Sequence, residues 1–173
     1  AAAYDNGFIY DYTISDGLAL KAAYDPSKGT DVQSSTELGV QYTGMEGLTV
    51  SVAMGENNEL ADQIDLTVMN LKYAMGPITV GYQSNESDRG TGTDEDFTAY
   101  GISYQVNDDV AISYGASSLD YSSALEDQES SAVSISFTAG GVAMSASHQT
   151  TDNVAGATAT DNSSYEINFS FAF

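Results

Sequence analysis

Apolar and polar residues alternate with a period of two along almost the whole chain. In one segment, Val110, Ile112 and Tyr114 take every second position, and the positions between them are Ala, Ser and Gly. This period is typical of a β-strand, because successive side chains of a strand point to opposite faces of its sheet. Ten segments follow the pattern: 8–14, 18–24, 37–43, 48–55, 78–83, 100–106, 110–116, 133–138, 142–147 and 165–173.

An eleventh segment, from Ile64 to Met75, changes its apolar side midway. A β-bulge near Val68 and Met69 would shift the parity of the strand, and a misplaced boundary would have the same effect. With this segment included, we expect 11 strands.

Short turns and longer loops alternate between these segments. The short turns are rich in Gly and Asp, which tolerate the backbone of tight hairpins, and they recur about every 30 residues. They lie at Ser15–Gly17, Glu46–Gly47, Gly76–Pro77, Asn107–Asp109 and Gly140–Gly141. The longer, acidic connections lie at 25–33, 56–63, 85–95, 121–129 and 152–162. The order predicts an antiparallel up-and-down meander with two chemically different ends.

The composition excludes several classes of protein. Among 173 residues, 25 are acidic and 4 are basic, and a net charge of -21 does not suit a chain that binds nucleic acid. The chain has no Cys and a single His, so a disulfide framework and a Cys-ligated zinc site are excluded. The longest uncharged stretch, 130–151, is interrupted by Gly140–Gly141 and does not resemble a transmembrane helix.

Alternation alone fits both a soluble β-sandwich and a transmembrane β-barrel. Here Tyr and Phe gather near the strand ends, the polar side is small or hydrogen-bonding, and every strand has the same pattern. A sandwich would instead show Greek-key connections and two inner faces of large residues. Strands of about 10 residues with apolar and polar sides, aromatic ends and alternating loop lengths favour an all-β, antiparallel up-and-down transmembrane barrel. A soluble, secreted acidic β-protein is the alternative.

The last segment ends on Phe, with an apolar residue at every second position before it. It resembles the C-terminal assembly signal of Gram-negative outer-membrane β-barrels, and the resemblance gives that role to Tyr165, Ile167, Phe169, Phe171 and Phe173. The whole chain is similar to general porins of the α-proteobacterial type in its acidic loops, its Tyr-rich strands and the segment 17–24, GLALKAAY.

The resemblance implies an outer-membrane channel for passive diffusion of small hydrophilic solutes and ions, not an enzyme. Such a channel takes about 16 strands, so residues 1–173 are expected to form the C-terminal part of a longer barrel. The expected partners are outer-membrane lipid, lipopolysaccharide, the barrel-assembly machinery, two further copies in a homotrimer, and small solutes. Neither nucleic acid nor a cofactor is expected.

The polar sides of the strands would then line the pore. The predicted pore-lining residues are Asp11, Lys21, Glu37, Gln41, Ser51, Lys72, Gln83, Gln105, Ser113, Ser134, Ser145 and Glu166. Lys21 and Lys72 are the basic candidates among them. Since the loops are strongly acidic, we expect a mild preference for cations that fades at high ionic strength. No segment is identified as a constriction loop.

Three further interpretations stay open. The barrel could be an adhesin, a scaffold or a phage receptor without an open pore. An enzyme would have to use His148, the one candidate base, which lies near a strand end and fits an interfacial position better. The carboxylates of Glu56, Glu59 and Asp62, or of 94–96, offer oxygen ligands for Ca²⁺ or Mg²⁺, but acidic loops are usually solvated and we predict no metal site.

Overall fold

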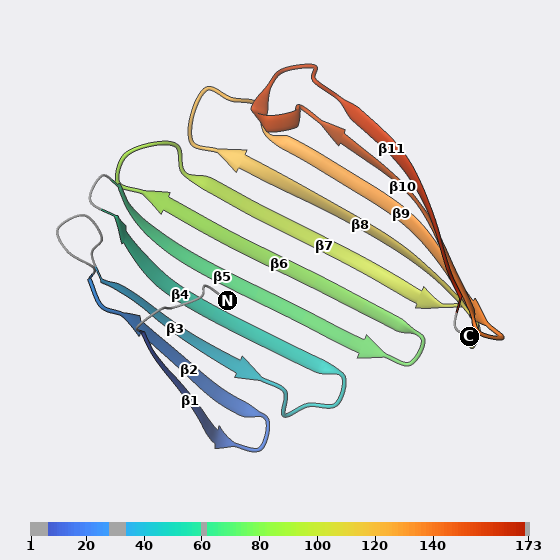
Figure 1. Ribbon diagram of the computed structural model, residues 1–173, viewed down its shortest axis with the longest axis horizontal. Coiled ribbons are helices and arrows are strands. Elements are labelled where there is room, and N and C mark those ends of the chain that lie inside the picture. Colours follow the sequence, from blue (N-terminus) through green and yellow to red (C-terminus); the bar gives the residue numbers. More distant parts are fainter. Residues whose placement is uncertain (1–6, 28–33, 60–61, 172–173) are drawn as a thin grey trace.

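The described residues of the chain fold into one antiparallel sheet of eleven strands, each hydrogen-bonded to its neighbours in sequence (Figure 1). The computed structural model describes residues 7–27, 34–59 and 62–171. The strands are β1 (Phe8–Ser15), β2 (Leu18–Asp25), β3 (Ser35–Tyr42), β4 (Leu48–Glu59), β5 (Asp62–Met75), β6 (Ile78–Arg89), β7 (Glu95–Gln105), β8 (Val110–Tyr121), β9 (Gln128–Ala139), β10 (Val142–Asp152) and β11 (Asn162–Phe171). The up-and-down meander and the number of strands are confirmed.

The cross-strand register assigns every side chain to one of two faces. Residues that are directly opposite on paired strands share a face, and Ser113 is opposite both Ser103 and Ser134. The hydroxyl oxygens of Ser113 and Ser134 lie 2.7 Å apart, within hydrogen-bond distance. Ile112 belongs to the other face, opposite Tyr104 and Ile135. The sheet therefore separates its small polar residues from its large apolar ones.

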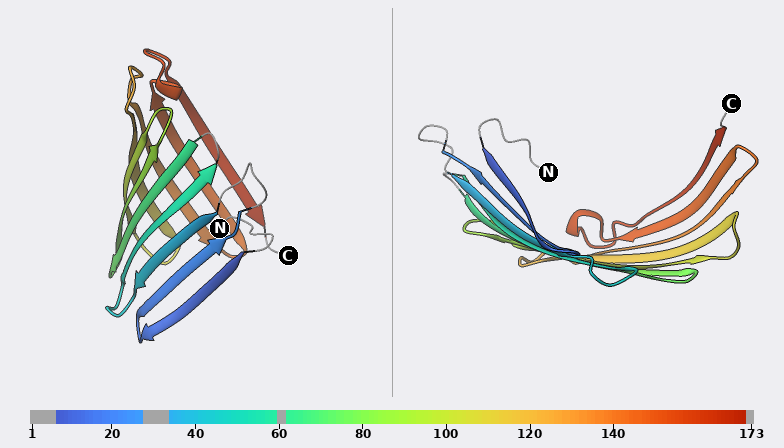
Figure 2. Two further views of the ribbon diagram at one scale, coloured as in Figure 1. Left: turned by 90° about the vertical axis from the view of Figure 1, so that its left-hand side faces the viewer. Right: turned by 90° about the horizontal axis from the view of Figure 1, so that it is seen from below.

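The sheet bends into a trough (Figure 2). A 3₁₀ turn, η1 (Val154–Gly156), lies inside the trough in the right-hand view. In this turn the Ala155 N–H donates to Gln128 Oε1 at 2.8 Å, so the side of the sheet that carries Gln128 is the inner one. We call it the concave face and the opposite side the convex face. The small polar residues lie on the concave face.

The apolar residues have no partner layer within the described part of the chain. No hydrophobic side chain there is buried, and on the convex face Ile102, Ile112 and Ile135 are 47%, 44% and 47% exposed. The described strands form one sheet, so they do not form the sandwich that a soluble alternative requires. An apolar surface of this extent marks a face that meets lipid or another protein.

The described sheet is not closed. Strand β1 is paired with β2 alone, and β11 with β10 alone. Both edge strands therefore present unpaired backbone groups, a state that lipid does not tolerate and that a closed barrel removes.

One prediction about β4 and β5 is wrong. The sequence predicts a long loop over 56–63, but β4 continues to Glu59 and β5 begins at Asp62, with paired backbones throughout. Of the two explanations left open for the change of parity near Val68 and Met69, the bulge is not present, because the register of β5 is continuous against both β4 and β6. Polar side chains near the strand ends make this stretch look like a loop.

The tight turns lie where the sequence predicts them. Gly140 and Gly141 both have positive φ, 58° and 79°, as a two-residue hairpin turn requires. We call this end of the sheet the short-turn end and the opposite one the long-loop end. The predicted loop 25–33 lies mostly outside the described residues. Within the described ranges, no helix is long and apolar enough to cross a membrane.

Candidate functional site

All the predicted pore-lining residues lie on the concave face. Cross-strand partners share a face, and following them from β1 to β11 places each of these residues on the same side of the sheet. The residues are Asp11, Lys21, Glu37, Gln41, Ser51, Lys72, Gln83, Gln105, Ser113, Ser134, Ser145 and Glu166. The structure brings them onto one surface. That this surface lines a pore stays a prediction.

A row of hydroxyl groups runs across four neighbouring strands of the concave face. Thr79, Ser103, Ser113 and Ser134 are consecutive cross-strand partners on β6, β7, β8 and β9. Hydroxyl groups donate and accept hydrogen bonds, so this row can replace part of the hydration of a passing polar solute.

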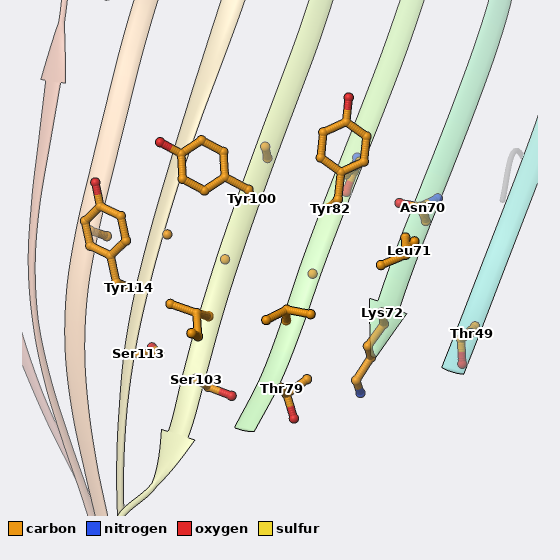
Figure 3. A pocket seen from close by; sticks show the side chains of 18 of the residues that line it. Thr49, Asn70, Leu71, Lys72, Thr79, Tyr82, Tyr100, Ser103, Ser113 and Tyr114 are labelled. Atoms are coloured by element: carbon orange, nitrogen blue, oxygen red, sulfur yellow. The ribbon is translucent and has the colours of Figure 1, made fainter. Parts of the chain in front are cut away.

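A row of glycines lies beside the hydroxyl row. Gly81, Gly101 and Gly115 are partners on β6, β7 and β8, and Lys72 of β5 is opposite Gly81. Since these positions have no side chain, the wall is thin there and carries a hollow of about 630 Å³ (Figure 3). The hollow widens the trough at the level of Lys72.

The two lysines of this face differ in their surroundings. Lys21 Nζ lies 3.2 Å from Asp11 Oδ1, and both side chains are exposed, so the pair contributes little to stability. Their charges nevertheless cancel on that part of the wall. Lys72, on β5, is one of the residues that line the hollow (Figure 3).

The polarity of the two faces reverses near the long-loop end. There the convex face carries the cross-strand partners Glu86, Asp96 and Asp120, and the concave face carries Phe97 and its partner Leu119. The alternating segments predicted from the sequence, 78–83, 100–106 and 110–116, do not reach these residues, because β6, β7 and β8 are longer at this end than the pattern indicates.

An aromatic level marks the reversal. Tyr82 and Tyr100 are partners on the convex face, and the next residues on that face toward the long-loop end are Ser84 and Thr98. Aromatic girdles of this kind border the apolar band of a transmembrane barrel. The acidic residues beyond the girdle would then stand in water, which explains why the polar side moves outward.

The predicted assembly residues follow the apolar side of the last strand. Tyr165, Ile167, Phe169 and Phe171 are opposite β10 residues of the convex face and are highly exposed. Phe173 lies outside the described residues. Their role as an assembly signal stays a prediction.

The candidate catalytic base lies on the convex face. His148 stacks on its cross-strand partner Tyr165, with ring centroids 4.2 Å apart. This packing fits the interfacial position that the sequence suggests, at the level of other aromatic residues of the convex face.

Of the candidate metal ligands, Glu59 and Asp62 have side chains outside the described part of the structure, and the others do not converge within it. No group of three or more His, Asp or Glu side chains there could hold an ion. The Asp94 carboxylate instead accepts from the Arg89 N–H at 2.8 Å, and the Asp94 N–H donates to Ser122 Oγ at 2.8 Å. Asp94 therefore orders the loop between β6 and β7.

Sequence reasoning misses one element of the site. The pattern predicts an acidic loop between β10 and β11, but the η1 turn of this connection folds onto the concave face (Figure 2). Its residues 153–160, NVAGATAT, carry no charge and no large side chain, so nothing in the local pattern distinguishes them from a solvated loop.

Comparisons with known proteins agree with this architecture. A family model described as Gram-negative porin matches residues 1–123. An anion-selective porin from Comamonas acidovorans shares the fold, with a TM-score of 0.81 and 14% identity over 98% of this chain and 60% of that one. The outer-membrane protein OmpT of Vibrio cholerae shares it with a TM-score of 0.66 and 19% identity over 96% of this chain and 63% of that one. No curated protein matches the sequence.

The chain is shorter than the solved proteins that share its fold. It spans 60% of the length of the Comamonas acidovorans porin and 63% of the length of the Vibrio cholerae protein. At identities of 14% and 19%, the likeness shows the fold alone.

Proposed function

The chain belongs to the Gram-negative porin family, and from this premise we propose that it supplies part of the wall of a water-filled channel for passive diffusion. It is a protein of the outer membrane. The carrying observation is a single curved sheet whose convex face is apolar and exposed and whose concave face bears small polar residues. The solutes would be small, hydrophilic molecules and ions, and no catalytic step is involved.

The eleven described strands would form the larger part of a barrel of about 16, of the general-porin type suggested by the acidic loops. Two observations support a larger closed sheet. Within the described residues, the outer edges of β1 and β11 are not hydrogen-bonded to another strand, and the chain covers 60% of the solved porin from Comamonas acidovorans. Strand β11 would be read by the barrel-assembly machinery, and three copies would form the functional unit. Lipopolysaccharide would surround the long-loop end.

Cation preference is the finer part of the proposal. It rests on two observations. The chain has 25 acidic and 4 basic residues, and of the two lysines in the predicted lining, the charge of Lys21 is balanced by Asp11, so that Lys72 is the other basic residue there. The porin from Comamonas acidovorans is named as anion-selective. At 14% identity the two walls carry different side chains, and charge selectivity depends on those side chains.

The test is electrical. The full-length protein that contains this chain is reconstituted in a planar bilayer under a KCl gradient, and conductance and reversal potential are recorded. We expect discrete open-channel steps and a potential of the sign that K⁺ preference produces. Steps with a potential of opposite sign would contradict the charge preference alone. A folded, inserted barrel without conductance would contradict the channel and favour a receptor or scaffold.

A matched pair of variants connects the result to this chain. Lys72→Gln should increase the preference for K⁺, since it removes one positive charge from the predicted wall beside the glycine row. Asp16→Asn changes an acidic residue in the turn between β1 and β2, at the short-turn end, and should alter the potential less.

A further inference from the structure

The connection between β10 and β11 leaves the plane of the sheet and turns into the trough. Its η1 turn (Val154–Gly156) lies inside the concavity in the right-hand view of Figure 2. A loop of this kind could equally extend outward into water, so its inward course needs a physical cause.

The first cause is a fitted contact at Gly156. This residue is buried and has a φ of 73°, a conformation that favours glycine. A Cβ placed there would lie 2.8 Å from Leu125 Cβ and 3.2 Å from Tyr121 Cε2. The backbone of the loop therefore rests directly on Leu125 and Tyr121, with no room for a side chain.

The second cause is a set of hydrogen bonds between this loop and residues 126–128, at the end of the β8–β9 connection and the start of β9. They are Ala155 N to Gln128 Oε1 at 2.8 Å, Glu126 N to Gly156 O at 3.1 Å, and Asn153 Nδ2 to Asp127 O at 3.1 Å. Within the loop, Val154 N donates to Thr160 O at 2.8 Å. These bonds satisfy backbone groups that the inward turn removes from water.

The backbone of the loop is also strained. Asn153, Ala155 and Ala159 have positive φ of 52°, 56° and 56°, and they are the non-glycine residues with this property within the described ranges. Such conformations persist where surrounding contacts over-determine them, and they gather at functional sites. Strain confined to one inward loop indicates that its position is maintained by the contacts around it.

We propose that residues 153–160 form a fixed constriction that sets the size limit of the channel, with Gly156 as its anchor. The inference rests on the proposed channel function. The segment carries no charge, so it restricts solutes by their size and leaves charge preference to the wall. Gly156, Leu125 and Tyr121 have a positioning role in this constriction, because they hold the loop in place and need not touch the solute.

Two variants of the full-length protein test this role. Gly156→Ala introduces a Cβ that meets Leu125 and Tyr121 and should displace the loop from its seat. Replacement of residues 154–160 by Asn-Gly removes the constriction outright. Gly140→Ala is the matched control, because Gly140 also has positive φ, 58°, but lies in a short turn with nothing within 4 Å of the added Cβ.

The readouts are single-channel conductance and the swelling rates of proteoliposomes in a monosaccharide, a disaccharide and a trisaccharide. We expect both loop variants to raise conductance and to lose discrimination between the disaccharide and the monosaccharide, with the ion preference unchanged. Gly140→Ala should behave as the unmodified protein. Folding of each variant is checked by its heat-modifiable migration in gels.

The outcomes separate the two levels of the proposal. If the unmodified protein conducts and the folded loop-replacement variant keeps the same conductance and size discrimination, the constriction is refuted and the channel stands. If Gly156→Ala does not fold, the loop-replacement variant alone decides. If the unmodified protein does not conduct, the channel function fails and the constriction with it.

Discussion

At the scale of single residues, Ile112 and Ser113 are adjacent in β8 but belong to opposite faces of the sheet. Ile112→Arg would place a charge against lipid and should reduce the free energy of unfolding by about 2–4 kcal/mol if the residue lies near the midplane. Ser113→Arg should leave stability almost unchanged and lower the conductance, because the new side chain enters the predicted pore. Urea unfolding in lipid vesicles measures the first effect. Equal losses for the two variants would contradict the assignment of the faces.

A second residue-scale prediction concerns Asp96, which lies between Glu86 and Asp120 on neighbouring strands. Like charges directly opposite each other destabilise a sheet, so Asp96→Asn should raise the free energy of unfolding by about 0.2–1 kcal/mol at low salt. The gain should shrink in concentrated salt, where these exposed charges are screened. In a protein that already carries Glu86→Gln, Asp96→Asn should raise the free energy of unfolding by less. An equal increase there would exclude repulsion between Glu86 and Asp96 as the source of the effect.

At the scale of elements, period-two patterning is enough to predict the strands, because each central strand segment has one apolar and one polar side. The tight turns can be predicted from Gly residues such as Gly140 and Gly141. The ends of the long strands could not be predicted, because the side that carries the polar residues changes along these strands. The residues around Asp65 are as polar as a loop, yet they continue β5 beyond the aromatic level. The inward η1 turn depends on contacts with distant residues, Leu125 and Tyr121, which no local pattern records.

The continuous register of β5 yields an element-scale prediction. Spin labels placed one at a time along 68–75 should alternate without interruption between water and lipid exposure. Labels at Met69 and Leu71 should be accessible to oxygen in lipid, and labels at Val68 and Asn70 to a water-soluble relaxing agent, because the register places these pairs on opposite faces. Two neighbouring positions with the same exposure would show that the strand contains a bulge.

At the scale of the whole molecule, the distribution of charge and the shape of the sheet lead to one prediction about salt. The net charge is -21, and acidic residues near the long-loop end such as Glu86, Asp96 and Asp120 lie on the convex face, not on the concave face that is predicted to line the pore. Such charges act on ions at a distance. The Debye length is about 10 Å at 0.1 M salt and about 3 Å at 1 M, so their influence at the channel mouth should fade over this range.

The preference for K⁺ should accordingly be clear at about 0.1 M KCl and close to lost at about 1 M, while the size limit set by an uncharged loop should be the same at both concentrations. Reversal potentials and sugar-swelling rates, measured on the same reconstituted protein at the two concentrations, provide the comparison. A preference for K⁺ that persists at about 1 M would locate the selecting charges on the wall of the pore, where the predicted lining carries the carboxylates of Glu37 and Glu166, and not at the acidic long-loop end.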